Sequence, residues 1–482
     1  MPLIRLIVLV ILCATSGCRA IAPSARQVRQ QQPSRNNSIA ATPTEIHSIR
    51  PVSFHQVAES EQMGPAVTAA EIETVIDEQV GQVISSQIPF EYLDAAVVDL
   101  DHCIEVAMSI SPAISEIQSE IGALRGKHLQ AGLPVNPTVG INGSDINENG
   151  DAGRYGFFYG NTIIRGDKQR LSQNIVCNEI RQKEIELVEL RQRLRTDVKQ
   201  AYYAILVANE KYKLTDQLVE LSRDAVEATQ GLLAAKEIAR TSLIQAELEM
   251  QNALIQKQRA NNELAGTRER LAVLLGQTEL HFGSFAGELV ETDPLIIENQ
   301  FDNLLALSPE IARIHARVAM ARSNLTRQQV EPIGNVTWQT SVAYDFASDD
   351  VVTGFQIGLP VPKFNQNQGA IGQARHEVAA AEAGVEKRTL QLKQKLVQTY
   401  QAYRDAKIQV ESYEANVLPK AKETLELVTE GFQQGEVDFL QLLTAQRTFF
   451  QSNLAVIEQQ GVMWRHRIAM EGLLLSGSLE SR

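Results

Sequence analysis

The sequence predicts a mainly α-helical fold with a membrane β-barrel contribution, built as a tandem repeat of helix, two strands, long helix and helix. Three observations predict it: a duplicated sequence pattern, two pairs of segments with alternating polarity, and two long stretches without proline. The stretches 168–230 and 365–417 lack proline altogether. At 1.5 Å per residue, a helix of about 60 residues is roughly 90 Å long, far beyond the usual globular helix.

The N-terminus predicts export. Arg5 provides a positive charge before the apolar segment 6–14, which has the size of a signal-peptide core. The tetrapeptide that ends at Cys18, Thr15-Ser16-Gly17-Cys18, resembles a bacterial lipobox, although Thr15 stands where leucine is usual. We therefore expect residues 1–17 to be a lipoprotein-type signal peptide and Cys18 to be acylated. Cleavage by an ordinary signal peptidase near Ala20 is the alternative.

Residues 18–65 are rich in Ser, Gln, Asn, Pro and Arg and show no periodicity, which is typical of a disordered tether. Residues 66–98 remain an uncertain N-terminal segment, with a short helix at 67–83 as one interpretation. The whole chain has 45 Lys+Arg against 58 Asp+Glu, a formal charge of −13. A general nucleic-acid-binding protein normally carries a basic surface, so we expect no nucleic-acid partner.

The body of the chain carries an internal duplication. Ser111-Pro112 recurs 197 positions later as Ser308-Pro309, and Pro134 recurs 198 positions later as Pro332. Tyr202 recurs at Tyr400, again at 198, and Ala246-Glu247 corresponds to Ala445-Gln446 at 199. A nearly constant offset over more than 100 residues indicates two repeats, which we place at 99–300 and 301–478.

Each repeat contains two segments that alternate between apolar and polar residues, the pattern of a strand with two unlike faces. We expect strands at about 135–145 and 155–165 in the first repeat, and at about 334–346 and 351–360 in the second. Ten residues are enough for a tilted strand to cross a bilayer. The predicted lipid-facing set is Tyr155, Phe157, Trp338, Val342, Tyr344, Phe355 and Ile357, and the predicted lumen-facing set is Gln339, Ser341 and Gln356.

A soluble hairpin packed on a helix is the alternative interpretation of these strands. Two features favour the membrane: the outward sets hold most of the aromatics of these strand segments, as interfacial girdles do, and the opposite sets suit a wet lumen. The first long helix also has an apolar stripe at three- and four-residue steps, including Leu194, Val198, Tyr202 and Ile205, which is typical of a coiled coil.

Four strands cannot close a barrel, and an open edge in lipid leaves backbone groups unpaired. Chains must therefore combine their strands, giving eight strands for two copies or twelve for three. Because eight strands leave room for little beyond side chains, the trimer is the assembly that forms a conduit.

Five motifs, in order, resemble the outer membrane efflux protein family, which is TolC-like, and most of all its heavy-metal CzcC/CusC-type branch. They are the start at 100–112, the segment 131–137 before the first strand, the helix entry at 359–374, the turn at 432–438, and Ala445-Gln446 after that turn. The first repeat departs from the pattern, because Lys236 replaces the glycine of the turn and Gly166-Asp167-Lys168 replaces the helix entry.

The resemblance implies a homotrimer with a twelve-stranded barrel in the outer membrane and an α-helical barrel in the periplasm. Such a channel passively conducts metal cations, drugs or other substrates that a periplasmic adaptor protein and an inner-membrane pump deliver. It implies an adaptor-docking tip at the two helical turns: Lys236, Ile238, Ala239, Arg240, Thr241, Phe432, Gly435, Glu436, Val437 and Asp438. Gly435 can adopt positive φ in this turn at no steric cost. It can equally be a plain glycine that ends a helix, and the two interpretations are compatible.

The sequence offers no catalytic motif of the GxSxG, Walker, GxGxxG or HExxH type, and its eight histidines are scattered. Asp101-His102-Cys103 with Glu105 tempts a metal assignment, but adjacent residues on a helix point in different directions. We therefore expect no enzyme, no cofactor and no resident metal. An exported coiled-coil envelope protein without a pore remains the alternative function.

Overall fold

The computed structural model describes residues 97–146, 153–277, 284–289, 291 and 301–479. Cys18, the tether and the segment 66–96 lie outside the described residues. The elements of the first repeat are β1 (Val97–Val98), α3 (Leu100–Ile110), α4 (Pro112–Gly132), β2 (Thr138–Ser144), β3 (Arg154–Ile163), α5 (Lys168–Ala234), α6 (Arg240–Leu274) and β4 (Ser284–Phe285). Those of the second are α7 (Phe301–Ala306), α8 (Pro309–Val330), β5 (Val336–Asp345), β6 (Asp350–Gly358), α9 (Gln368–Ser412), a π-helical turn (Tyr413–Val417), α10 (Leu418–Gln433) and α11 (Phe439–Glu471).

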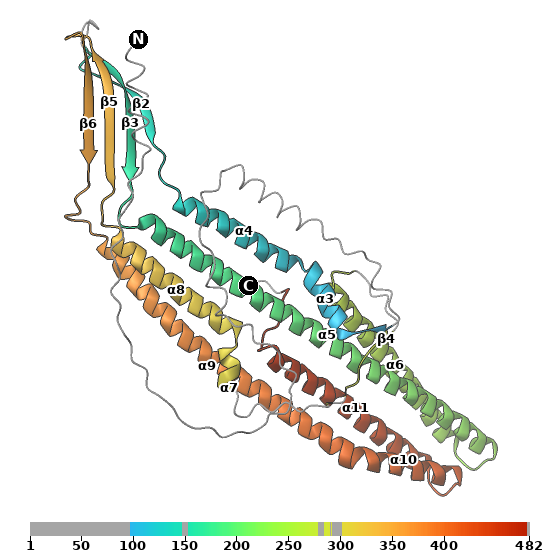
Figure 1. Ribbon diagram of the computed structural model, residues 1–482. Coiled ribbons are helices and arrows are strands. Elements are labelled where there is room, and N and C mark those ends of the chain that lie inside the picture. Colours follow the sequence, from blue (N-terminus) through green and yellow to red (C-terminus); the bar gives the residue numbers. More distant parts are fainter. Residues whose placement is uncertain (1–96, 147–152, 278–283, 290, 292–300, 480–482) are drawn as a thin grey trace, which may run out of the picture. The chain divides into compact units, whose positions relative to one another are not determined.

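The mainly helical fold with two strand hairpins is confirmed (Figure 1). The four strands form one antiparallel sheet in the order β2-β3-β5-β6, so a hairpin from each repeat meets at the β3–β5 pair. Helices α4, α5, α8 and α9 follow the same order, with α5 packed between α4 and α8. Among the described helices, none has both the length and the hydropathy to cross a membrane.

Two helices differ from the expected continuous ones, and proline explains both. The first helix of each repeat is split in two: Ser308-Pro309 separates α7 from α8, and Ser111-Pro112 separates α3 from α4 in the same way. Proline disfavours a helical conformation in the preceding residue but fits the first turn of a new helix. The second long helix ends at Ser412 and passes through the π-helical turn before Pro419, whereas α5 runs unbroken for 67 residues.

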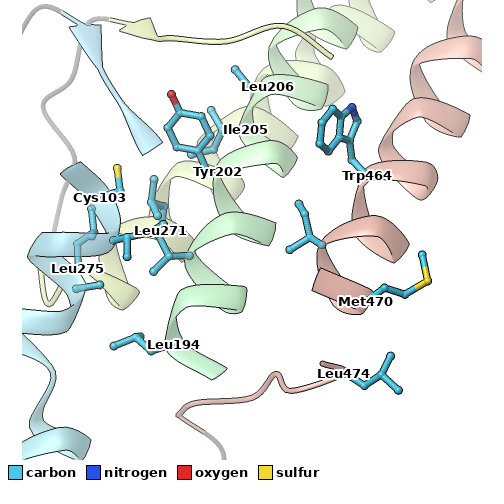
Figure 2. Close-up of a cluster of buried hydrophobic side chains, with 14 of the residues drawn as sticks. Cys103, Leu194, Tyr202, Ile205, Leu206, Leu271, Leu275, Trp464, Met470 and Leu474 are labelled. Atoms are coloured by element: carbon cyan, nitrogen blue, oxygen red, sulfur yellow. The ribbon is translucent and has the colours of Figure 1, made fainter. Parts of the chain in front are cut away.

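The main hydrophobic core draws on both repeats (Figure 2). The buried stripe of α5, with Leu194, Val198, Tyr202 and Ile205, lies at its centre. Cys103 of α3, Leu271 of α6 and Trp464 of α11 complete it from different elements. The predicted stripe thus lies in a core shared by the two repeats, and the next face of α5 meets the second repeat, where Tyr203 stacks on Trp464 of α11 with ring centroids 4.2 Å apart.

The segment between the repeats is fastened to both of them. The Tyr202 hydroxyl donates to the carbonyls of Val98 and Ala286, at 2.9 and 2.5 Å, where β1 and β4 form a short parallel pair. Beyond it, the buried carboxylate of Glu291 accepts hydrogen bonds from Tyr403, Lys407 and Arg467 at 2.6, 2.9 and 2.5 Å. The connection is therefore held by neutral hydrogen bonds to the first repeat and by an ionic cluster to the second.

Candidate functional site

The sheet has two chemically different faces. Residues directly opposite each other on paired strands point to the same side, so the strand registers define both faces. One face carries Val139, Ile141, Gly143, Tyr155, Phe157, Tyr159, Asn161, Ile163, Val336, Trp338, Thr340, Val342, Tyr344, Val351, Thr353, Phe355 and Ile357. All seven residues predicted to face lipid lie on it. Phe157 and Phe355 are 70% and 69% exposed, so this apolar face is uncovered in the single chain, which is typical of a surface that contacts a membrane or another protein.

Aromatic side chains gather at both ends of this apolar face. Tyr344 and Tyr155 both contact Phe346 edge-on, with centroids 5.0 and 5.8 Å apart, beside the loop end of the strands. Tyr159 and Trp338 contact each other at 5.5 Å near the helical end. The row between the two groups consists of Ile141, Phe157, Val342 and Thr353, so it is mainly apolar and itself contains an aromatic ring.

The opposite face is polar along most of its length. Gln339 and Gln356 are direct partners, and Ser341 lies on the same side two residues along the strand, so the three predicted lumen residues share one face. Near the loop end, Arg154 Nε donates to Asp345 Oδ2 at 2.9 Å, an ion pair that joins the hairpins of the two repeats. Sequence reasoning missed this pair, because its two residues are 191 positions apart.

Phe158 is the aromatic residue among those described on the polar face. It pairs with Gly140 and Ser341 and lines the same shallow hollow as Gln339 and Gln356. A Cβ at Gly140 would lie 2.5 Å from the Phe158 ring, so only glycine leaves room for it. The aromatic side chain thus covers a glycine on the neighbouring strand, a known way to stabilise a sheet.

The two helical turns predicted to form the tip have the same backbone. Lys236 and Gly435 both adopt a left-handed conformation, with φ of 63° and 73°. The N–H of Glu237 donates to the Leu232 carbonyl and that of Glu436 to the Gly431 carbonyl, both at 2.9 Å, which is the Schellman bond that ends a helix. Lys236 therefore occupies the glycine position without being a glycine.

The remaining predicted tip residues differ in exposure. Ala239, Arg240, Thr241, Glu436 and Asp438 are exposed, whereas Ile238 and Val437 are half-buried. The Asp438 side chain caps α11 by accepting hydrogen bonds from the N–H groups of Leu440 and Gln441. Ala239 at the equivalent position of α6 has no such group.

Phe432 does not fit a direct docking role, because it is 3% exposed. It lies 6.0 Å from Phe439, centroid to centroid, in a cluster that includes Ala225 and Val226 of α5 and Ala246 of α6. The two helical hairpins therefore pack together just behind their turns, and Phe432 supports the turns from inside.

The described residues contain no group of three or more His, Cys, Asp or Glu placed to hold a metal ion. Cys103 and Cys177 are free thiols on α3 and α5. Burial, together with the nearby Asp99, raises the pKa of the Cys103 thiol to about 11, so this cysteine is an inert core residue.

Solved structures share this arrangement. The outer-membrane channel OprN superimposes with a TM-score of 0.67 at 17% identity, over 79% of this chain and 90% of that one. The open state of the MtrE outer membrane channel of Neisseria gonorrhoeae gives 0.62 at 17% identity, over 78% and 89%. CusC gives 0.64 at 14% identity, over 78% and 92%. The fold is that of a TolC-like channel protein.

Sequence comparison points in the same direction as the structural one. Residues 301–474 match the family model of the outer membrane efflux protein. The cobalt-zinc-cadmium resistance protein CzcC of Cupriavidus metallidurans is 22% identical over 292 residues, which cover 60% of this chain and 69% of that protein. The second repeat thus matches the outer membrane efflux protein family, and the described fold is similar to that of solved outer-membrane channels.

Proposed function

We propose that three copies of this chain form the outer-membrane conduit of a tripartite efflux system. The observation that carries the proposal is the four-stranded sheet, with an exposed apolar face, an opposite polar face, and edge strands β2 and β6 that pair with no other described strand. Three such sheets joined edge to edge give twelve strands, with the apolar faces toward lipid and the polar faces around a water-filled lumen.

The conduction mechanism is passive. A lumen wall of Gln339, Ser341 and Gln356 presents uncharged polar groups, which suits the passage of many hydrated solutes. Relatives include a cobalt-zinc-cadmium resistance protein, which favours metal cations as cargo. Drugs remain the second cargo class, because the described polar face carries no cluster of metal-binding side chains.

The helical turns at 235–239 and 434–438 are the proposed docking points for the periplasmic adaptor, six in a trimer. They lie at the ends of α5 and α10 that are farthest along the chain from the strands. An added Cβ at Gly435 meets no atom within 4 Å, so a substitution acts through the positive φ alone. We expect Gly435→Val to assemble in the outer membrane yet lose adaptor crosslinking and efflux, and normal efflux would contradict the tip assignment.

Acylation of Cys18 is proposed to anchor each copy to the membrane. Fatty-acid labelling and globomycin-sensitive processing are expected in the native chain and absent in Cys18→Ser. Labelling that persists in Cys18→Ser would contradict the anchor.

Planar-bilayer recording tests the channel itself. The purified trimer is expected to give stepwise ion conductance, because the lumen is continuous with water on both sides. A stable protein that never conducts, under several voltages and salt concentrations, would favour the alternative of a structural coiled-coil protein of the envelope.

A further inference from the structure

The two repeats present different edges to the outside. Sheet order places β2 of the first repeat at one edge and β6 of the second at the other. The helices follow the same order, α4-α5-α8-α9, so α4 and α9 are the outer helices of the set (Figure 1). In a ring of copies, which rests on the proposed function, α9 of one protomer lies beside α4 of the next.

Contacts inside one protomer indicate what this contact between protomers looks like, because the repeats have matching geometry. Lys127 of α4 donates to Glu179 of α5 at 2.6 Å, and Asn324 of α8 donates to Glu377 of α9 at 3.5 Å. These pairs occupy equivalent positions, at offsets of 197 and 198. The same offsets convert the α5–α8 contact within a protomer into the α9–α4 contact between protomers.

The α5–α8 contact includes a buried carboxylate, Glu189, which Arg193 of the same helix also binds, at 2.6 Å. The Glu189 carboxylate, 1% exposed, accepts a hydrogen bond from Arg313 Nε at 3.0 Å. Its equivalent on α9 is position 189 + 198 = 387, a lysine, and the equivalent of Arg313 on α4 is position 313 − 197 = 116, a glutamate. Lys387 and Glu116 are both exposed. The two positions therefore again carry opposite charges, but the long helix now carries the positive charge and the short helix the negative one.

A second pair of positions agrees in shape. Asn178 Nδ2 donates to Ser323 Oγ at 2.9 Å between α5 and α8. The equivalents on the outer helices are His376 and Gly126. A Cβ at Gly126 would meet no atom within 4 Å in the single chain, so a larger imidazole opposite it has room. The larger side chain on one helix thus faces the smaller one on the other.

We propose that Lys387 of one protomer pairs with Glu116 of the next, and that this reversed pair selects the head-to-tail contact of the ring. A two-fold contact would place Glu116 near Glu116, or Lys387 near Lys387, and like charges repel. Lys387 and Glu116 can pair only when α9 of one protomer contacts α4 of the next. A head-to-tail contact of this kind closes into a ring, whereas a two-fold contact ends at a dimer.

Carbodiimide crosslinking of the native trimer tests the contact without any mutation. The reagent activates the Glu116 carboxylate, the Lys387 amine attacks it, and an amide forms as the reagent leaves as a urea. We expect dimers and trimers on a denaturing gel and a Glu116–Lys387 peptide by mass spectrometry, both lost in Glu116→Gln. Efficient crosslinking of the trimer through other residues, without this peptide, would overturn the pair.

Charge reversal tests its energetic role. Glu116→Lys and Lys387→Glu are each expected to lower the trimer fraction severalfold after mild heating in detergent, and the double reversal is expected to return it to within about twofold of the native value. Glu386→Lys is the matched control, because its equivalent on α5, Val188, stays 46% exposed in a protomer where α8 is packed on α5. Losses that simply add in the double variant would overturn the proposal.

These outcomes separate the pair from the channel. Native trimers that conduct ions but tolerate both single reversals leave the channel intact and remove the Glu116–Lys387 contact. A native chain that neither forms trimers nor conducts contradicts the channel and the contact together.

Discussion

The two helical turns of this protein reach one backbone geometry with different residues. In the second repeat, Gly435 takes the left-handed conformation without steric cost and Asp438 caps the following helix. In the first repeat, Lys236 takes the same conformation and Ala239 provides no cap. The hydrophobic cluster that joins α5, α6, α10 and α11 behind both turns explains how the first turn keeps this conformation. Packing holds the first turn, whereas the local sequence of the second turn already favours it.

Loss of the Phe432 side chain is expected to have the largest effect on the stability of the two turns. Phe432→Ala removes a buried ring from the shared cluster, which costs about 3–5 kcal/mol of unfolding free energy. Hydrogen exchange is expected to increase at 235–239 as well as at 434–438, because the first turn depends on the same cluster. Leu233→Ala, at the equivalent but half-buried position, is the milder control. A change confined to the second turn would show that the first does not rely on packing.

The stability of the link between the repeats is expected to depend on pH where it contacts the second repeat, through Glu291, and not where it contacts the first. Burial alone would raise the pKa of the Glu291 carboxyl, but hydrogen bonds from Tyr403, Lys407 and Arg467 hold it below its usual value. A lowered pKa stabilises the fold above the unfolded-state value of about 4.3, and this stabilisation disappears as the pH falls through the folded-state pKa.

Glu291→Gln is therefore expected to lose about 1.5–3 kcal/mol at pH 7, with a smaller loss in acid. Thermal unfolding of the native and variant chains at several pH values measures the difference. Tyr202→Phe, which removes the neutral hydrogen bonds to the first repeat, is the control, with a loss that is the same at each pH. A constant loss for Glu291→Gln would contradict the ionic account.

Exchange of the turn residues tests the backbone argument directly. Gly435→Ala is expected to cost about 1–2 kcal/mol, because a Cβ disfavours positive φ, and Lys236→Gly is expected to stabilise its turn by a similar amount. The local free energies of opening from hydrogen exchange measure both. Equal signs for the two substitutions would mean that φ does not control these turns.

The cap predicts the smallest effect. Asp438→Ala is expected to cost about 1 kcal/mol, and Ala239→Asp to gain part of that amount at the other turn. Thermal unfolding of the two single variants and of the double variant measures both contributions. A neutral Asp438→Ala would show that the packing of Phe439 alone starts α11.

Local patterns made the sheet predictable. Alternation with period two located the four strands. The register places all the predicted lipid-facing side chains on one face of the sheet and all the predicted lumen-facing side chains on the other. β3 and β6 begin one residue before the expected positions. Phe158 was not predictable, because its compensation is Gly140 on another strand, and only the register brings the two together.

Long-range contacts set the limit of prediction elsewhere. In the Glu291 cluster, the partners of Glu291 lie between 112 and 176 positions away from it in the sequence, so no local pattern predicts the cluster. Nor did the sequence reveal that Lys236 would replace glycine without changing the turn, since the cause is packing from the other repeat. The breaks at Pro112 and Pro309 were present in the sequence as serine-proline pairs that start helices.

Thiol accessibility in the membrane tests the central claim, that the two faces of the sheet separate lipid from a water-filled lumen. In a Cys177→Ser background, single cysteines replace Gln339 and Gln356 on one face, and Trp338 and Phe355 on the other. A membrane-impermeant thiol reagent is expected to modify the first two rapidly and to leave the second two unreacted. The opposite pattern would mean a register shifted by one residue, and equal reactivity at all four positions would contradict the channel.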